Sequence, residues 1–527
     1  MTAQWKTGQA TEHSYRPALK TLLEGLLQKV IVINEPQHIK CGAPDYILRD
    51  KRTALHLGFI EAKDIGDGDL DGNGVHKEQF NRYKNSLESL CFTDYLDFHF
   101  YEGGEFKDKV RIAEVCGEKL VPAAEPVIEK FVGMIEHFGS AKAQKITSPI
   151  RLAKLMAGKA RLLAQAIKEF LLQDTEKESM LAGQMAAFRD VLIHDISEES
   201  FADVYAQTIT YGMFAARLHD ETPEDFTRAE AASLIPKTNP LLRQMFNYIA
   251  ADTNDTVEWI VDDLITLFAA TDLREIMKDY GKSTEQTDPI LHFYEDFLAA
   301  YNPDLRKARG VWYTPQPVVG FIVRSVDIIL ETMFGLQGGL ANNTKAKFKV
   351  VNDNKTKKSD KEFIEREMHR VQVLDPATGT GTFLAEVVRR IYSKFAGMEG
   401  MWQNYVSEHL LPRLNGFEIL MASYAMAHLK LDMLLAETGY KHESNERLRV
   451  FLTNSLEEHD KEVGTLFAAA LSKEANEANF LKRDCPVMVV IGNPPYSVSS
   501  SNKGEWIQNL IGDYKKNLNE KKINLDH

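Results

Sequence analysis

The chain has 527 residues, of which 44% are hydrophobic and 26% are charged, and its formal net charge is −13. It is too long for one hydrophobic core, so we expect two to four domains. The negative total excludes a protein that is basic over its whole surface. DNA binding stays open, because phosphate contacts need only a local basic surface.

The N-terminus and the cysteines indicate the compartment. Residues 1–16 are polar and lack the apolar core of a signal peptide, and no stretch reaches the roughly 20 apolar residues that a membrane helix needs. The four cysteines lie far apart, without the spacing of metal ligands. Sparse, unpaired cysteine suits a reducing compartment, so we predict a cytoplasmic protein without a membrane segment.

Three regions follow one another along the chain. Residues 1–138 combine a predicted helix at 16–29 with short β-rich runs, and residues 139–300 show apolar positions at helical spacing almost throughout. Residues 301–527 alternate apolar strands with helices, which is typical of a parallel α/β sheet. The predicted fold class is therefore α/β, with an all-α segment between two α/β domains.

Two short strands of the first region carry acids at their edges. Residues 41–48 contain Asp45, and residues 57–63 contain Glu61 and Lys63. Carboxylates on adjacent strands could hold Mg²⁺, which prefers oxygen ligands. Lys63 shares a face with Glu61 by the strand period of two, and could position or activate a water that attacks a phosphate.

This ordered set resembles the PD-(D/E)xK nuclease core. The resemblance implies Glu24 as a supporting carboxylate on the preceding helix, and Gln79 and Tyr83 as a Gln-x-x-x-Tyr element on the helix that follows. A plain α/β accessory domain is the alternative, because Glu-x-Lys alone is common by chance.

A glycine-rich turn follows the first strand of the third region. The apolar run 371–375 ends in an acid and leads through the turn into a helix. Glycine there lets the backbone pass close to a bulky ligand, at the strand end where open α/β sheets bind nucleotides. The string resembles motif I of amino-methylating DNA methyltransferases. This resemblance implies contacts to S-adenosylmethionine from Asp375, Pro376, Ala377, Thr378, Gly379, Gly381 and Phe383.

The next two strands contribute further cofactor residues. Glu418 ends the second strand, where an acid can accept hydrogen bonds from ribose hydroxyls. It lies 37 residues beyond Gly381, past the usual ~20, and residues 396–409 look like an added helical piece. Asn454 ends the third strand, and by resemblance it reads the adenine amine of the cofactor, although most relatives have Asp there.

A segment upstream of the first strand resembles motif X, a lid over the cofactor. It spans residues 310–315 and implies Thr314 and Pro315 as cofactor contacts. Trp312 and Tyr313 could equally be core aromatics.

A fourth apolar strand ends in Asn493-Pro494-Pro495-Tyr496. The exocyclic amine of adenine is a poor nucleophile, and the Asn493 side-chain oxygen and the Pro494 carbonyl could accept its two hydrogens and localise its lone pair. The prolines stiffen the loop, and Tyr496 offers a ring on which a flipped-out base can stack. The motif also occurs in enzymes that methylate glutamine amides, but the motif I string and the first region argue for DNA.

The whole order resembles single-chain restriction–modification enzymes of type IIG or type ISP. It implies a PD-(D/E)xK nuclease-like domain at 1–138, an all-α connector at 139–300, and a Rossmann-like methyltransferase domain of the gamma class at 301–527. The implied partner is double-stranded DNA. The implied cofactors are S-adenosylmethionine and, held by Asp45 and Glu61, Mg²⁺ for a restriction endonuclease. The connector would couple the two activities.

The end of the sequence adds one expectation. Motif order X, I, II, III, IV places the target recognition domain after the catalytic motifs, and only 31 residues follow Tyr496. We therefore expect a C-terminally truncated chain with an incomplete methyltransferase sheet and no target recognition domain. Two alternatives stay open: a methyltransferase with an inert nuclease-like domain, and a non-catalytic subunit of DNA modification.

Overall fold

The computed structural model describes most of the chain. The described residues are 12–34, 44–52, 56–116, 119–140, 146–220, 222, 226–235, 239–250, 255–278, 289–302, 314–351, 363–441, 446–457, 466–494, 509, 511–512 and 516. Two compact units emerge: unit 1 with residues 1–173, 216–234 and 247–301, and unit 2 with residues 174–215, 235–246 and 302–527. The helices expected to form one connector are thus shared between the units, and the three-domain division stays a prediction.

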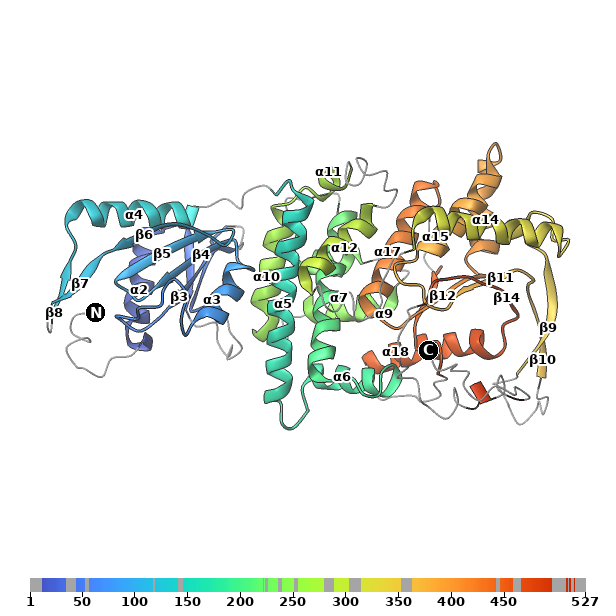
Figure 1. Cartoon of the computed structure of the whole chain (residues 1–527), viewed down its shortest axis with the longest axis horizontal. Coiled ribbons are helices and arrows are strands. Elements are labelled where there is room, and N and C mark those ends of the chain that lie inside the picture. Colours follow the sequence, from blue (N-terminus) through green and yellow to red (C-terminus); the bar gives the residue numbers. More distant parts are fainter. Residues whose placement is uncertain are drawn as a thin grey trace. The chain divides into compact units, whose positions relative to one another are not determined.

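Unit 1 contains a six-stranded mixed sheet (Figure 1). Its strands, in spatial order, are β1 (Val30–Asn34), β2 (Tyr46–Asp50), β3 (His56–Ala62), β4 (Ser89–Thr93), β5 (Asp97–Glu102) and β6 (Glu105–Arg111). Only β3 and β4 pair in parallel; the other neighbours are antiparallel. A parallel pair needs a crossover, and α3 (Lys77–Lys84) lies in it. A small hairpin of β7 (Ala113–Cys116) and β8 (Lys119–Pro122) follows.

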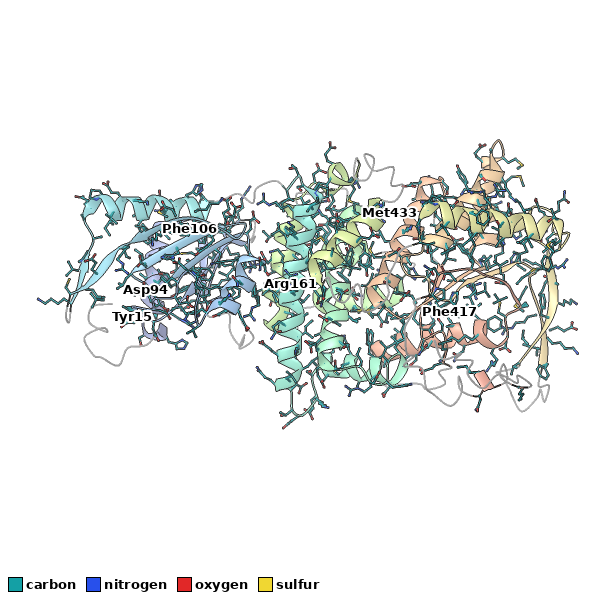
Figure 2. The ribbon with its side chains drawn as sticks, viewed as in Figure 1. Tyr15, Asp94, Phe106, Arg161, Phe417 and Met433 are labelled. Atoms are coloured by element: carbon teal, nitrogen blue, oxygen red, sulfur yellow. The ribbon has the colours of Figure 1, made fainter. Side chains whose placement is uncertain are left out.

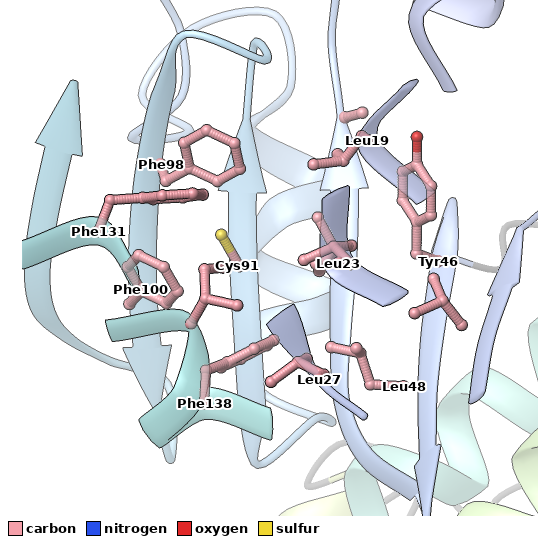
Figure 3. Close-up of a cluster of buried hydrophobic side chains, with 14 of the residues drawn as sticks. Leu19, Leu23, Leu27, Tyr46, Leu48, Cys91, Phe98, Phe100, Phe131 and Phe138 are labelled. Carbon is pink, nitrogen blue, oxygen red and sulfur yellow. The ribbon is translucent and has the colours of Figure 1, made fainter. Parts of the chain in front are cut away.

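Helices α2 (Glu12–Leu26) and α4 (Glu125–Ser140) pack on this sheet. On α2 the buried Tyr15, Leu19 and Leu23 recur every four residues, so they form one apolar face. Figure 3 shows this face against β2, and the aromatic side chains of α4 against β5. Phe131 and Phe98 have ring centroids 4.8 Å apart. The shared core fixes which face of α2 looks toward the sheet.

The expected helical segment is helical. It contains α5 (Pro149–Gln173), α6 (Met180–Val191), α7 (Glu198–His219), α8 (Arg228–Leu234), α9 (Pro240–Ala250), α10 (Asp255–Ala269), α11 (Leu273–Lys278) and α12 (Pro289–Tyr301). Within unit 1, Arg161 of α5 (labelled in Figure 2) donates to the carbonyl oxygens of Ala300 and Tyr301 at 2.5 and 3.2 Å. These hydrogen bonds connect the end of α12 to α5.

Unit 2 contains a parallel sheet, which confirms the expected alternation of strands and helices. Among the described residues it has four strands in the order β13 (Arg449–Leu452), β12 (Leu414–Glu418), β11 (Gln372–Asp375) and β14 (Val487–Val490). The buried Phe417 lies within it (Figure 2). The accompanying helices are α14 (Gln316–Thr332), α15 (Thr382–Tyr392), α17 (Met421–Glu437) and α18 (Leu466–Arg483), and β9 (Lys345–Val351) pairs with β10 (Phe363–His369) as an antiparallel hairpin.

The helical piece expected between the first two strands is present. Short helical turns occupy residues 393–395 and 399–410. Tyr405 in this piece donates to the carbonyl oxygen of Ala341 at 2.9 Å, and the buried Arg413 donates to the Tyr405 hydroxyl at 2.6 Å. In the described part of the chain, no helix is both long and apolar enough to cross a membrane.

Candidate functional site

The expected cofactor and catalytic residues of unit 2 gather at one edge of its sheet. Asp375 is the last residue of β11 and Glu418 the last residue of β12, while Asn454 and Asn493 closely follow β13 and β14. Because all four strands are parallel, these carboxyl ends meet at the same edge.

Hydrogen bonds join the first two strand ends. Glu418 accepts the backbone N–H of Gly379 at 2.7 Å on Oε2, and those of Ile419 and Leu420 at 2.9 and 2.8 Å on Oε1. The acid of the second strand therefore holds the glycine-rich turn of the first, despite the long insertion between them.

Both carboxyl groups are buried. Burial, together with the charge of Glu418, raises the pKa of Asp375 to about 7. Burial likewise raises the pKa of Glu418 to about 7, against the hydrogen bonds from its backbone partners. Asp375 Oδ1 accepts from Ala377 N at 3.1 Å, whereas Oδ2 is buried and has no hydrogen-bond partner among the described residues. The edge thus offers an acceptor that a hydrogen-bond donor could satisfy.

The two glycines of the turn serve different needs. Gly379 and Gly381 have φ values of +56° and +81°, in the left-handed region that other residues rarely adopt. A Cβ at Gly381 would lie 3.4 Å from Ala427, so this glycine also allows close packing against α17. No described atom lies within 4 Å of the Cβ position at Gly379, so the turn there faces open space.

Two residues expected to contact the cofactor are buried beneath the turn. Thr378 donates through its hydroxyl to the carbonyl oxygen of Asp375 at 3.1 Å and through its N–H to that of Phe417 at 2.9 Å. A Cβ at Gly416 would lie 2.4 Å from the Thr378 hydroxyl. Phe383 is buried on α15. Pro376 and Ala377 are partly exposed at the turn itself.

The turn after β13 is held by residues that the sequence reading missed. Lys482 of α18 donates to Thr453 Oγ1 at 2.8 Å and to the carbonyl oxygens of Asn454 and Glu457 at 2.6 and 2.7 Å. The Ser455 hydroxyl donates to the carbonyl oxygen of Pro376. Asn454 accepts the N–H of Leu456 at 3.1 Å within the turn. No motif spacing marks Lys482, because its role depends on how α18 packs.

The segments expected as motifs X and IV meet. Asn493 Nδ2 donates to Thr314 Oγ1 at 3.0 Å, and Pro315 caps α14 directly after Thr314. A Cβ at Gly492 would lie 2.5 Å from Asp375 Oδ1, so β14 passes close to the first strand end. Pro494 is exposed. Trp312, Tyr313, Pro495 and Tyr496 lie outside the described residues.

In unit 1 the structure brings together four of the six expected nuclease residues. Tyr46 pairs with Ile60, which sets Asp45 opposite Glu61, and Asp45 Oδ2 accepts from Ala62 N at 2.7 Å. Glu61 Oε1 accepts from Lys63 Nζ at 2.6 Å and from Gln79 Nε2 at 2.7 Å. Lys63 Nζ also donates to Gln79 Oε1 at 3.2 Å. We call Asp45, Glu61, Lys63 and Gln79 the acid–lysine cluster.

Tyr83 adjoins this cluster from α3. It lies one turn after Gln79 and is fully buried. Burial raises the pKa of its hydroxyl, and the negative charge of Glu61 raises it further. Tyr83 therefore stays neutral and supports the cluster through packing.

Glu24 lies elsewhere. Its carboxylate is exposed and 3.8 Å from Lys20 Nζ on the same helix. Arg16 is the α2 residue at the cluster, with Nη2 2.5 Å from Asp45 Oδ1. Glu24 lies eight residues beyond Arg16, about 12 Å along the helix axis. The apolar face of α2 sets this register, so the helix supplies a guanidinium where a carboxylate was expected.

The acid–lysine cluster has the donor type that Mg²⁺ requires. Two carboxylates from adjacent strands fit an ion that takes its other ligands from water and phosphate. Within the described ranges, no group of three or more His, Cys, Asp or Glu side chains could hold a metal ion.

Residues 285–522 match the family described as N-6 DNA Methylase. This part of the chain is therefore similar to N-6 DNA methylase domains. The paired strand ends and the Thr314–Asn493 contact lie inside the matched range. The matched range is thus the part of the chain that carries the candidate cofactor edge. The chain matches no curated protein.

Three solved structures are similar over part of their length. The first, "cryoEM structure DrdV-DNA complex", has a TM-score of 0.42 and 20% identity, covering 98% of this chain and 46% of that one. The second is the ATP-dependent type ISP restriction-modification enzyme LlaBIII bound to DNA, with a TM-score of 0.49 and 18% identity, covering 74% of this chain and 24% of that one. The third is the type IIG restriction endonuclease BpuSI, with a TM-score of 0.26 and 12% identity, covering 93% of this chain and 46% of that one. The chain spans less than half the length of each.

Proposed function

We propose that the chain transfers a methyl group from S-adenosylmethionine to the exocyclic amine of adenine in double-stranded DNA, as part of a restriction–modification system. The observation that carries the proposal is the range that matches N-6 DNA methylases, in which the acids of two strand ends and Asn493 share one sheet edge.

The residues at this edge fit S-adenosylmethionine. The unpartnered Asp375 Oδ2 could accept from an ammonium or hydroxyl group, and the open space at Gly379 would admit the ligand. Glu418 Oε2 has one lone pair left for a ribose hydroxyl, and Asn454 stands at the next strand end. When bound, the cofactor supplies an electrophilic methyl group on its sulfonium.

The Thr314–Asn493 contact suggests how the amine is activated. Because Asn493 uses Nδ2 to donate to Thr314, its Oδ1 is the atom turned to other donors. Oδ1 and the Pro494 carbonyl would accept the two amine hydrogens, which localises the lone pair and aims it at the methyl group. The base would be flipped out and stacked on Tyr496. Transfer would be direct: the bond from the amine nitrogen to the methyl group would form as the sulfonium–methyl bond breaks, the thioether S-adenosylhomocysteine would leave, and the surplus amine proton would pass to solvent.

The acid–lysine cluster supports a second activity, Mg²⁺-dependent DNA cleavage. Asp45 and Glu61 would hold the ion, which stabilises charge on the phosphate. Lys63, kept in place by Glu61 and Gln79, would position the attacking water. Arg16 would keep Asp45 oriented toward β3.

One experiment tests both activities and separates the alternatives. The 527-residue chain is incubated with labelled S-adenosylmethionine, Mg²⁺ and unmethylated DNA, and N6-methyladenine and strand breaks are measured for wild type, N493A and K63A. We expect N493A to lose only methylation and K63A to lose only cleavage. Methylation without cleavage would indicate an inert nuclease-like domain. If the wild-type chain shows neither methylation nor cleavage and binds no cofactor, the proposal is contradicted and a non-catalytic subunit is favoured.

A further inference from the structure

Helix α5 touches the turn that ends α3. Both lie in unit 1. A Cβ at Gly158 of α5 would lie 2.4 Å from the carbonyl oxygen of Asn85 and 2.9 Å from Ser86 Cα. Only a glycine permits this approach, so the backbones of α5 and of the α3–β4 turn are in direct contact.

The next residue of α5 strengthens this contact. Lys159 is 3% exposed, and its ammonium donates to the carbonyl oxygen of Ser86 at 3.2 Å and forms an ion pair with Asp263 of α10. A buried ammonium is stable only when it is paired and hydrogen-bonded. The α3–β4 turn therefore supplies one of the hydrogen-bond acceptors of the Lys159 ammonium, which belongs to the helical region. Arg151 of α5 adds an ion pair with Glu88 at the far end of the turn.

The α3–β4 turn is also hydrogen-bonded to α3, the helix that supports the acid–lysine cluster. The N–H groups of Ser86 and Leu87 donate to the carbonyl oxygen of Tyr83 at 3.0 and 2.8 Å. Gln79, one turn earlier, donates to Glu61 and accepts from Lys63. Because α3 has only eight residues, a shift at its end moves Gln79 as well.

A cavity next to this contact gives the turn room to move. It has a volume of about 60 Å³ and is bordered by His56, Glu88, Lys159 and Asp263, among others. Close-packed interiors resist displacement, whereas a turn beside open space can shift without compressing neighbouring atoms.

We propose that α5 positions the acid–lysine cluster through Gly158 and Lys159, so that the helical region controls whether Gln79 holds Glu61 and Lys63 in place. The inference rests on the proposed nuclease activity and names its regulation. Gly158 and Lys159 are positioning residues, since they act through α3 and touch neither metal nor DNA.

Gly158→Ala tests the contact without weakening α5, because alanine favours a helix by about 1 kcal/mol over glycine. Gly133→Ala on α4 is the matched control, since no described atom lies within 4 Å of its Cβ position. Hydrogen exchange of residues 77–87 and Mg²⁺-dependent cleavage are measured on the full chain. Thermal melting checks the folding of unit 1, and cofactor binding checks unit 2. We expect G158A to speed exchange in α3 and lower kcat for cleavage, each about tenfold, with the KM for DNA and cofactor binding unchanged. G133A should match wild type.

Lys159→Met and Lys159→Arg form a second pair. K159M should reproduce the G158A effects, and K159R, which keeps a donor and a charge, should restore much of the activity. Wild-type exchange in α3 in both G158A and K159M would overturn the inference, as would altered exchange with unchanged cleavage. If wild type cleaves no DNA, the nuclease proposal fails, and the exchange measurements alone decide whether α5 fixes α3.

Discussion

Asn493 and Thr314 are joined by a hydrogen bond of 3.0 Å although 179 residues separate them in sequence. The bond connects the segment before α14 with the end of β14 and orients the amide that would receive the target adenine. We expect Thr314→Val, which keeps the shape and removes the hydroxyl, to lower kcat for methyl transfer about tenfold, since losing one oriented hydrogen bond costs on the order of 1 kcal/mol.

Thr314→Ser is the control for this change, because it retains the hydroxyl. Single-turnover methylation separates the effect on kcat from cofactor binding, which titration calorimetry measures. Equal rates for T314V and T314S would show that this bond does not orient Asn493.

Asp375→Asn should weaken cofactor binding strongly yet stabilise the cofactor-free chain at alkaline pH. Burial raises the pKa of Asp375 to about 7 in the folded chain, so the folded state binds a proton more tightly than the unfolded state. Stability from this group is therefore full below its ordinary pKa and falls as the pH rises toward 7. Asparagine does not ionise, so D375N does not lose this stability as the pH rises. Thermal melts at pH 5 and pH 8 should show a gain for D375N at pH 8 only, and a similar loss at both values would contradict this account.

Affinity for S-adenosylmethionine should rise between pH 6 and pH 8 and then level off. The cofactor is a cation, so it favours the ionised forms of Asp375 and Glu418, whose pKa values of about 7 mean that protons must leave on binding. Calorimetry in buffers of different ionisation enthalpy measures that release directly. D375N serves as the comparison at cofactor concentrations high enough to detect residual binding, where its pH dependence should be weaker. A pH-independent wild-type affinity would argue against a site between these two acids.

Lys63→Ala should lower Mg²⁺-dependent cleavage by about a hundredfold or more, since the lysine would position the water in the transition state. Lys107→Ala, at an exposed ion pair on β6, is the matched control and should be without effect. Strand breaks in plasmid DNA are the measurement, with methylation recorded in the same samples. If K63A still cleaves DNA at the wild-type rate, the cleavage comes from another site or from a contaminating nuclease.

Features that depend only on the local order of residues could be predicted from the sequence. A short apolar run followed by glycines predicts a strand, a turn and a helix, and β11, Gly379, Gly381 and α15 form that series. Apolar periodicity likewise predicted the helices of residues 139–300, and Asp45, Glu61 and Lys63 stood out because strands alternate their side chains between two faces. These signals lie within a few residues of each other, so they need no knowledge of packing.

Tertiary structure alone decided which distant groups meet. It placed Lys482 on the turn after β13, paired Asn493 with Thr314, and set Arg16 rather than Glu24 beside Asp45. It also divided the helices between two units. The apolar face of α2 fixes the rotation of that helix, and the packing of α18 on its sheet fixes where Lys482 reaches. Such rotations follow from burying apolar surface against elements far away in the chain, which no local spacing records.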